Sequence, residues 1–434
     1  MATGIVVTGS DHPLHSAQPL IDALLSQRQA SHRLRSLSTA QPLDATHLKI
    51  NGKRYVNFCS NNYLGLSRHP RVLAAVEAAQ RSAGFGSGAA GLLRGHTTFH
   101  ESAARAIAQW KGTEDAVLLP SGYQANLAAV QTLAAISKST GAPPVRFLLD
   151  KLVHASILDA VSATDLTMRI FPHNNLAKLS RLLTGENLDV VITESIFSMD
   201  GDAADLRGIA KLKQKQPFFL LLDEAHASGV YGKNGAGYAQ SLGVQHAVDA
   251  SVVTLSKALG GVGGAICSTK TFSNGVVNFG RAYIYSTSLP AAAAAAAEAA
   301  IEIMRDEPHR QKRLADLSFR VRTELTKARA RLLPGDSPII CCLLGSEESV
   351  LAAAEKLFQQ GLIVAAVRPP TVAPGSSRLR ISLCSEHSDE EVTALLAAIT
   401  KLCASGSPAR AGPDRPAPSS SRKGRPAARR RTTN

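Results

Sequence analysis

Short, fully apolar runs recur along most of the chain and alternate with longer stretches of helical periodicity. Runs of this kind, rich in Val, Ile and Leu and lacking a polar face, are typical of strands covered on both sides. Strands that alternate with helices predict an α/β fold with a mostly parallel sheet and right-handed connections. The runs lie at 116–119, 147–149, 190–193, 218–222, 252–255 and 264–267.

The part of the chain before these runs has two patterns of its own. Residues 20 to about 34 have the spacing of an amphipathic helix. Residues 49–58 indicate a hairpin with Asn51-Gly52 at its turn, because this pair suits the two-residue turn whose twist matches that of paired strands.

The pattern changes again after Pro290, where a long helical stretch continues to about Leu333. Shorter predicted strands and helices follow it and together form a small α+β domain. These elements are predicted at 338–344, 349–360, 362–367, 378–383 and 389–402. The expected division is an N-terminal segment, a large domain, a small C-terminal domain and a tail, at 1–56, 57–290, 291–403 and 404–434.

Size and composition narrow the class of protein. The 434 residues, 44% of them hydrophobic, suffice for a large core. No apolar stretch is long enough to cross a bilayer, and the first residues lack a signal-peptide pattern, so we expect a cytoplasmic protein without a membrane partner. The six cysteines include no Cys-x-x-Cys pair, which favours buried reduced thiols over a metal site.

Half of the net charge of +14 is concentrated in the 404–434 tail, where eight basic residues stand against Asp414 alone. The tail is rich in Pro, Ser, Gly and Ala, a composition that predicts disorder. We find no helix-turn-helix or zinc pattern, and we therefore expect no specific nucleic-acid partner. A solubilising role and attraction to an acidic carrier protein remain alternatives for the tail.

Lys257 follows the apolar run at 252–255 and leads into a glycine-rich segment. Asp223 and His226 follow the run at 218–222. Because the carboxyl ends of parallel strands meet at one edge of a sheet, we expect the three side chains to lie close together. A lysine amine that holds an aldehyde and a carboxylate that keeps a pyridine nitrogen protonated are what pyridoxal 5'-phosphate (PLP) chemistry requires. Lys257, Asp223 and His226 are therefore candidate catalytic and cofactor-binding residues.

Two further segments belong with this site. The segment 120–126 connects a strand to a helix, so the backbone around Gly122 is a candidate phosphate cradle, and Tyr123 brings an aromatic ring near it. His154 also follows a strand and is positioned to stack on the cofactor ring, while His226 is positioned to hydrogen-bond the phenolic oxygen.

Five segments resemble the α-oxoamine synthases, which are fold-type I PLP-dependent transferases that join an amino acid to an acyl thioester with loss of carbon dioxide. The resemblance extends from about Leu20 to Leu402 and implies homodimers with active sites at the interface. It also implies that Ser198 and Thr254 contact the cofactor, with Thr254 on its phosphate. The segments are Lys257 with its neighbours, 60–66, 193–202, 223–230 and 283–290.

The stretch 367–380 is similar to the branch of this family that condenses L-alanine with a pimeloyl thioester to give 8-amino-7-oxononanoate in biotin biosynthesis. This likeness implies that Arg380 holds the amino acid carboxylate, that Thr371 lines the substrate site and that Arg35 faces the substrate. In the implied cycle, Lys257 removes the Cα proton and His154 donates a proton to the thioester carbonyl. Thr287 or Ser288 would reach the phosphate bound by the neighbouring subunit.

One position departs from the family pattern, because Gly91 stands where an arginine is usual and Arg94 follows three residues later. This departure bears on acyl preference and leaves the lysine chemistry intact. Another α-oxoamine synthase activity, such as 2-amino-3-oxobutyrate formation from glycine and acetyl-CoA, is the alternative function for this chain. A fold-type I aminotransferase is a more distant alternative. The sequence leaves open whether coenzyme A or acyl carrier protein carries the acyl group.

Overall fold

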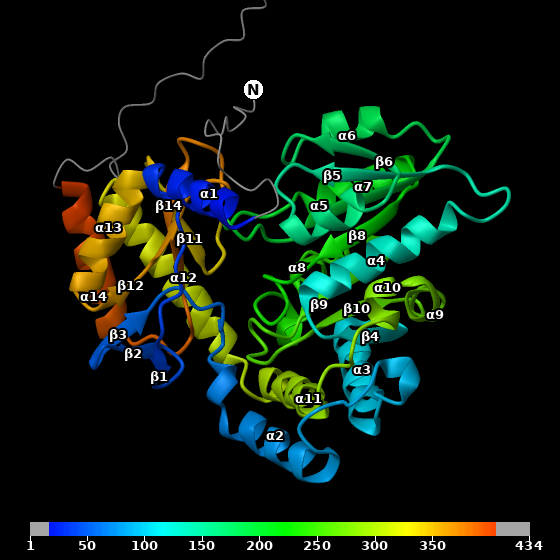
Figure 1. Cartoon of the computed structure of the whole chain (residues 1–434), viewed down its shortest axis with the longest axis horizontal. Coiled ribbons are helices and arrows are strands. Elements are labelled where there is room, and N and C mark those ends of the chain that lie inside the picture. The colour runs from blue at the N-terminus through cyan, green and yellow to red at the C-terminus, as the bar shows by residue number, and fades with distance from the viewer. Residues whose placement is uncertain (1–16, 405–434) are drawn as a thin grey trace, which may run out of the picture.

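The computed structural model describes residues 17–404, and the predictions for the 405–434 part of the tail lie outside that range (Figure 1). A seven-stranded sheet forms the centre of the large domain, in the order β4-β10-β9-β8-β7-β5-β6. The strands from β9 to β6 are parallel, while β10 runs antiparallel to both β4 and β9. The predicted mostly parallel α/β sheet is confirmed. The strands are β4 (Asp115–Leu119), β5 (Val145–Asp150), β6 (Thr167–Phe171), β7 (Leu188–Glu194), β8 (Phe219–Asp223), β9 (Ala250–Thr254) and β10 (Gly264–Ser268).

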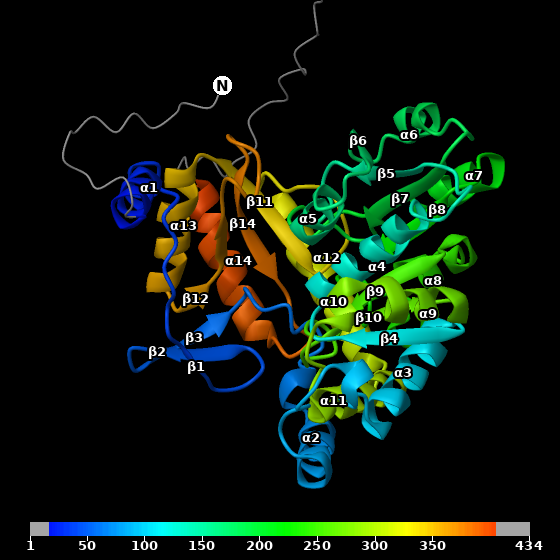
Figure 2. The same ribbon diagram turned by 45° about the vertical axis from the view of Figure 1, so that its right-hand side comes forward.

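Both faces of this sheet are covered along its inner strands, which explains why these strands have no polar face. Along β7, Val190 and Ile192 pack into one apolar cluster and Val191 into another on the opposite face. The first cluster contains α4 (Gly122–Ile136), α5 (Ala155–Ser162) and α9 (Lys270–Phe279). The second contains α6 (Leu176–Leu182), α7 (Leu206–Lys215) and α8 (Tyr238–Ser241) (Figures 1 and 2).

The long helical stretch predicted after Pro290 is two helices, α11 (Ala291–Asp306) and α12 (His309–Lys327). The break falls at Pro308, because proline removes a backbone donor and restricts the residue before it. The alanine-rich α11 packs against α2 (Pro70–Ala83) and α3 (Thr98–Lys111). A short helix, α10 (Arg281–Ile284), precedes α11.

The small domain is built on a three-stranded antiparallel sheet in the order β11-β14-β13. Its helix α13 lies beside α1 in both views (Figures 1 and 2). The elements are β11 (Ile339–Gly345), α13 (Glu347–Gln359), β12 (Leu362–Ile363), β13 (Ala365–Val367), β14 (Ser377–Ser382) and α14 (Asp389–Ala404).

The N-terminal segment forms α1 (Gln18–Ala30), β1 (Gln41–Pro42), β2 (His47–Ile50) and β3 (Lys53–Asn57). The predicted hairpin is present, and its turn residues Asn51 and Gly52 have φ angles of 48° and 79°, as a type I′ turn requires. β3 pairs in parallel with β12, so this segment and the C-terminal part of the chain share one sheet (Figure 2). The expected helix is shorter than predicted, and its leucines are about half exposed in the described chain.

Candidate active site

The carboxyl ends of β7, β8 and β9 bring the predicted chemistry together. Glu194 and Asp223, the last residues of β7 and β8, are direct neighbours in the sheet. His226 follows in the turn after β8, and its Nε2 lies 2.8 Å from Nζ of Lys257, which follows β9. The structure thus places the lysine, the imidazole and the carboxylate at one edge of the sheet, as the strand pattern predicts.

Lys257 is only partly accessible, and burial lowers the pKa of its amine from the ordinary 10.5 to about 8. The negative charges of Asp223 and Glu194 oppose this shift, while the positive charge of Arg380 adds to it. Because a lysine acts as a base or nucleophile only when it is neutral, this pKa suits catalysis near neutral pH.

Asp223 is buried and is held by two donors. Its Oδ2 accepts a hydrogen bond of 2.8 Å from Nδ2 of Asn126, and its Oδ1 accepts one of 2.8 Å from the backbone amide of Ala225. The same Asn126 side chain donates to Oγ of Ser156 at 2.9 Å. These bonds fix the direction of the carboxylate, as a group that must face a ring nitrogen requires.

His154 stands at the N-terminus of α5, where its Nδ1 accepts a bond of 3.2 Å from the backbone amide of Ser156. Its proton is therefore on Nε2, the nitrogen with which it can donate to a substrate. Burial lowers the pKa of His154, so the ring is neutral near pH 7. Tyr123 meets this ring edge-on, at 6.5 Å between the centroids.

The backbone around Gly122 fits a phosphate group. The amides at the start of α4 face Thr254, whose side chain lies 3.4 Å from where a Cβ on Gly122 would stand. A Cβ on Gly264 would come within 2.7 Å of the Gly122 nitrogen, so only glycine leaves this approach open. Thr254 Oγ1 also lies 2.8 Å from Oγ of Ser256, a hydroxyl beside Lys257 to which the sequence analysis assigned no role. Free helix amides with hydroxyls around them are a typical anion site.

Arg380 reaches the site from β14 in the small domain, and its side chain is buried. Its guanidinium donates to the Ser198 carbonyl at 2.7 Å, to Oγ of Ser382 at 2.8 Å and to Oδ1 of Asn61 at 3.2 Å. These three acceptors are uncharged, and no carboxylate within residues 17–404 pairs with the guanidinium, which is therefore a buried cation without an opposite charge beside it. Such a group is well suited to hold the carboxylate of a substrate.

Three residues to which the sequence analysis gave no role complete the site. The hydroxyl of Tyr63 lies 2.6 Å from Nδ1 of His226 and 3.3 Å from Oδ1 of Asn61. Glu194 is buried with its Oε1 unpartnered, and burial together with Asp223 raises its pKa well above the usual range. Asn61 and Tyr63 belong to the segment 60–66 that carries the family resemblance, but residue type alone does not reveal their contacts.

Arg35 and Thr371 are brought to each other rather than to the lysine. The Arg35 guanidinium donates to Oγ1 of Thr371 at 2.9 Å on the surface. Gly91 lies against the side chain of Tyr283, because a Cβ at position 91 would come within 2.8 Å of the tyrosine hydroxyl. The roles of Arg35 and Thr371 in substrate binding, and the effect of Gly91 on acyl preference, remain predictions.

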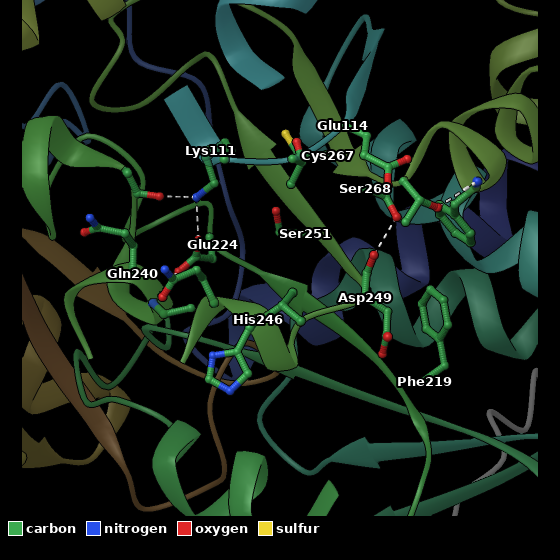
Figure 3. A pocket seen from close by; sticks show the side chains of 18 residues that line it. Lys111, Glu114, Phe219, Glu224, Gln240, His246, Asp249, Ser251, Cys267 and Ser268 are labelled. Carbon is green, nitrogen blue, oxygen red and sulfur yellow. Dashed lines mark hydrogen bonds and ion pairs between the residues drawn. The ribbon is translucent and has the colours of Figure 1, made fainter. Parts of the chain in front are cut away.

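A cavity of about 670 Å³ lies away from this site, around the side chain of Glu224 (Figure 3). Lys111 pairs with Glu224 and also donates to the carbonyl of Ala236, so the buried charges there neutralise each other.

Among the described residues, no group of three or more His, Cys, Asp or Glu is arranged to hold a metal ion. Within residues 17–404, no helix has the length and apolar character that crossing a membrane requires.

Comparison with known proteins places this architecture. The family model described as aminotransferase class I and II matches residues 53–399. The chain is 40% identical over 384 residues to a putative 8-amino-7-oxononanoate synthase of Desulforudis audaxviator, covering 88% of this chain and 98% of that protein. It is 38% identical over 388 residues to the 8-amino-7-oxononanoate synthase of Cronobacter sakazakii, covering 89% and 99%.

Two groups of solved structures are similar to this chain. A serine palmitoyltransferase from S. paucimobilis with a PLP–myriocin aldimine bound has a TM-score of 0.83 at 27% identity, covering 91% of this chain and 99% of that one. The 8-amino-7-oxononanoate synthase from Francisella tularensis has a TM-score of 0.71 at 28% identity, covering 81% and 98%. The chain is almost equally identical in sequence to the serine palmitoyltransferase and to this synthase, so the solved structures support only the fold that both enzymes share. The sequence relatives, at 40% and 38% identity, distinguish between these two branches of the family.

Proposed function

This chain belongs to the 8-amino-7-oxononanoate synthases within the class I and II aminotransferase family, and we propose that it condenses L-alanine with a pimeloyl thioester. The products are 8-amino-7-oxononanoate, carbon dioxide and the free thiol, and the enzyme is a PLP-dependent acyltransferase of biotin biosynthesis. The observation that carries this proposal is that Lys257 and the buried Arg380 converge on one site from two domains.

The residues present fit PLP. Bound PLP supplies an aldehyde that takes up amines and a cationic ring that withdraws electrons from the substrate Cα. Asp223 would keep the proton on the ring nitrogen, because a fixed carboxylate favours the charged form. The amides at the start of α4, Thr254 and Ser256 would hold the phosphate, and His226 would present Nε2 to the phenolic oxygen.

The chain's own groups then account for the proton transfers. Arg380 would exchange its contact with Asn61 for the carboxylate of L-alanine and orient the Cα–H bond toward Lys257. With a pKa of about 8, roughly one Lys257 amine in ten is neutral at pH 7 and can take this proton. His154 would donate its Nε2 proton to the thioester carbonyl oxygen, since its Nδ1 is engaged by Ser156.

The activity is tested with purified protein loaded with PLP and given L-alanine and pimeloyl-CoA, with glycine and acetyl-CoA in a parallel reaction. We expect thiol release and an amino-ketone of the mass of 8-amino-7-oxononanoate only in the first reaction. Turnover of glycine and acetyl-CoA alone would transfer the proposal to the other α-oxoamine synthases. Amino-group transfer to an oxo acid without thiol release would establish an aminotransferase instead.

The carrier of the acyl group is tested by replacing pimeloyl-CoA with pimeloyl-acyl carrier protein at equal concentration. Both carriers are anionic, so the basic surplus of the chain suits either one. The carrier with the higher kcat/KM is the better donor, and a salt dependence confined to the protein carrier would show that basic surface residues bind it.

We further propose a cytoplasmic homodimer with active sites at the subunit interface. Free cysteines throughout the described residues are in keeping with a reducing compartment. Exposed apolar side chains lie between α2 and α3, shortly after Lys257 and directly after α10, and covering them on a second subunit would stabilise a dimer. Sedimentation velocity measures the mass directly, and a 45.7 kDa species at micromolar concentration would contradict the dimer. The side chains are Phe85, Leu92, Leu93, Val262 and Tyr285.

A further inference from the structure

A continuous chain of hydrogen bonds joins Lys257 to Arg380 through the interior. Nζ of Lys257 lies 2.8 Å from Nε2 of His226, whose Nδ1 lies 2.6 Å from the hydroxyl of Tyr63. The Tyr63 hydroxyl lies 3.3 Å from Oδ1 of Asn61, and the same oxygen accepts a bond of 3.2 Å from Nη2 of Arg380. Tyr63 and Asn61 therefore connect the catalytic lysine with the arginine proposed to bind the substrate carboxylate.

The middle of this chain is shielded from solvent, so the protons of His226 and Tyr63 are placed by their own partners. Tyr63 is fully buried, and His226 and Arg380 are 4% and 5% exposed. Burial raises the pKa of Tyr63 to about 12 and lowers the pKa of His226 well below its usual range. Near pH 7 to 8 each therefore carries a single exchangeable proton, and a lost partner is not replaced by bulk water.

Two arrangements of these protons satisfy the geometry. A protonated Lys257 has no lone pair and must donate to Nε2, so that His226 carries its proton on Nδ1 and donates to Tyr63, which donates to Asn61. Next to a neutral Lys257, His226 can carry its proton on Nε2 and donate to the amine, while Tyr63 donates to Nδ1. A hydroxyl both donates and accepts, so Tyr63 can serve in either arrangement.

We propose that Tyr63 is a positioning residue that lets His226 exchange tautomers as Lys257 gains or loses its proton. Asn61 connects the Tyr63 hydroxyl with Arg380, the residue proposed to bind the substrate carboxylate. When Tyr63 donates to Asn61, the oxygen of Asn61 is shared with Arg380, which frees the guanidinium to hold a carboxylate. The inference deepens the proposed function and rests on it, since it links proton transfer at Lys257 with binding of the amino acid.

Other charged groups set the pH at which the exchange occurs. Asp223 and Glu194 face Lys257 from β8 and β7 and favour its ammonium form, whereas Arg380 from β14 opposes it. His154 from the start of α5 interacts with both Lys257 and His226. The positive charge of Arg380 also opposes the effect of burial on the pKa of Tyr63 and adds to the effect of burial on the pKa of His226, while Cys341 from β11 adds to the effect of burial on Tyr63.

The test uses the full-length, cofactor-free protein with ¹⁵N- and ¹³C-labelled histidine. NMR distinguishes the two tautomers of His226, whose signals are assigned by their loss in His226→Asn. Spectra are recorded from about pH 6.5 to about pH 9.5, on either side of the Lys257 pKa. We expect wild-type His226 to change from the Nδ1–H to the Nε2–H form, with a midpoint that follows Lys257 near pH 8.

In Tyr63→Phe we expect the change to move to lower pH, because an Nδ1–H would be buried without an acceptor, which disfavours the tautomer that accepts from the Lys257 ammonium. Tyr55→Phe is the matched control, since Tyr55 stacks on Phe358 and takes no part in the chain of hydrogen bonds described above. It should retain the wild-type change. Circular dichroism checks that each variant is folded.

The proposal is overturned if wild-type His226 keeps one tautomer while Lys257 titrates, or if folded Tyr63→Phe changes tautomer at the wild-type midpoint. The wild-type spectra alone decide the matter if Tyr63→Phe does not fold. Since neither PLP nor substrate is present, a negative result here leaves the proposed condensation reaction untouched.

Discussion

Arg380 is engaged by three uncharged oxygen acceptors before any substrate binds. Burial of this guanidinium removes its contacts with water, and the three uncharged acceptors do not supply the opposite charge that would offset this cost in free energy. A substrate carboxylate supplies that missing charge, so affinity for the amino acid should depend strongly on this one side chain.

Replacing Arg380 by lysine tests this dependence. Lysine keeps the charge but cannot present two parallel donors, and we expect kcat/KM for L-alanine to fall about 10- to 100-fold. The KM for the pimeloyl thioester should change little. Arg378→Lys is the control, because Arg378 pairs with Asp200 and should show a smaller effect on L-alanine. Equal losses for both substrates in Arg380→Lys would contradict a role specific to the amino acid.

The pKa of Lys257 predicts how cofactor uptake depends on pH. Burial lowers this pKa to about 8, so the reactive neutral amine increases as pH rises toward 8 and is nearly complete above about 9. The rate of covalent PLP capture by cofactor-free protein, followed by absorbance, should rise and level off accordingly. Lys257→Ala should lack this phase. A rate that began to rise only near pH 10 would show that burial does not depress the pKa.

At the scale of single residues, the sequence predicted those side chains that directly follow apolar strands. Lys257, Asp223 and His226 are of this kind, because the edge where parallel strands end follows from the fold class alone. Asn61 and Tyr63 belong to a segment before the sheet begins. Only packing of the whole chain shows that this segment returns to the lysine, so their roles could not be predicted from local pattern.

Among the larger elements, an ionic contact supports the loop that carries Ser198. His173 lies between Asp150 at the end of β5 and Asp202 beyond β7, at 2.9 Å and 2.7 Å. Burial by itself lowers the pKa of His173, but the two carboxylates outweigh it and raise the pKa to about 10. The ring is therefore charged at neutral pH and holds the loop against the sheet.

His173→Gln should reduce the free energy of unfolding by about 1–2 kcal/mol at pH 6, allowing for solvent at the exposed part of the ring. Because the folded-state pKa is raised, this stabilisation is complete below about pH 6.5 and is lost as pH rises through about 10. Urea denaturation of both proteins at about pH 6 and about pH 9.5 measures the difference. A difference that grew with pH would contradict the assignment of charge.

Gly91 allows a second test, which concerns the close packing of its backbone against the side chain of Tyr283. Gly91→Ala would place a Cβ within 2.8 Å of the Tyr283 hydroxyl, and we expect a loss of stability of about 1 kcal/mol. Adding Tyr283→Phe removes the obstructing oxygen and should restore most of that loss. Thermal unfolding of the single and double variants checks this. If the double variant were no more stable than Gly91→Ala, the tyrosine would not be the obstacle.

The element predictions succeeded where strands are buried on both faces. They missed β6, whose residues Thr167–Phe171 lie at the edge of the sheet and are mostly exposed, so that no apolar run marks it. The predicted helix beyond Pro290 continues only to Asp306, because Pro308 interrupts a pattern that otherwise looks continuous. For β6 the position at the sheet edge removed the apolar pattern, and for the long helix the single residue Pro308 interrupted it.

For the molecule as a whole, the largest apolar core is shared between the domains. One cluster of buried side chains includes Phe58 directly after β3, Ala265 from β10 and Leu379 from β14. Separate unfolding of either domain would expose this common core to water. The predicted large and small domains are thus joined by packing as well as by the chain.

We therefore expect a single cooperative transition in urea. Trp110, the only tryptophan, reports on the large domain, while far-UV circular dichroism reports on all helices. The two signals should follow the same curve within error. Two separated transitions would show that the small domain unfolds independently despite the shared core.

The pairing of β3 with β12 could not be predicted from sequence, because it joins residues about 300 positions apart in a strand of only two residues. Such a short strand gives no alternation to detect. The sequence therefore predicted the hairpin and the small domain separately, and the structure shows that they form one sheet.

That sheet also has consequences for how copies of the chain can meet. Its outer strands, β1 and β12, are each two residues long, and β1 contains Pro42, which has no amide hydrogen to donate. Exposed strand edges invite addition of strands from other molecules, and short edges with proline discourage it. At this sheet, copies of the chain should therefore meet through side-chain surfaces, with little tendency toward the open-ended, fibre-like growth that long free edges promote.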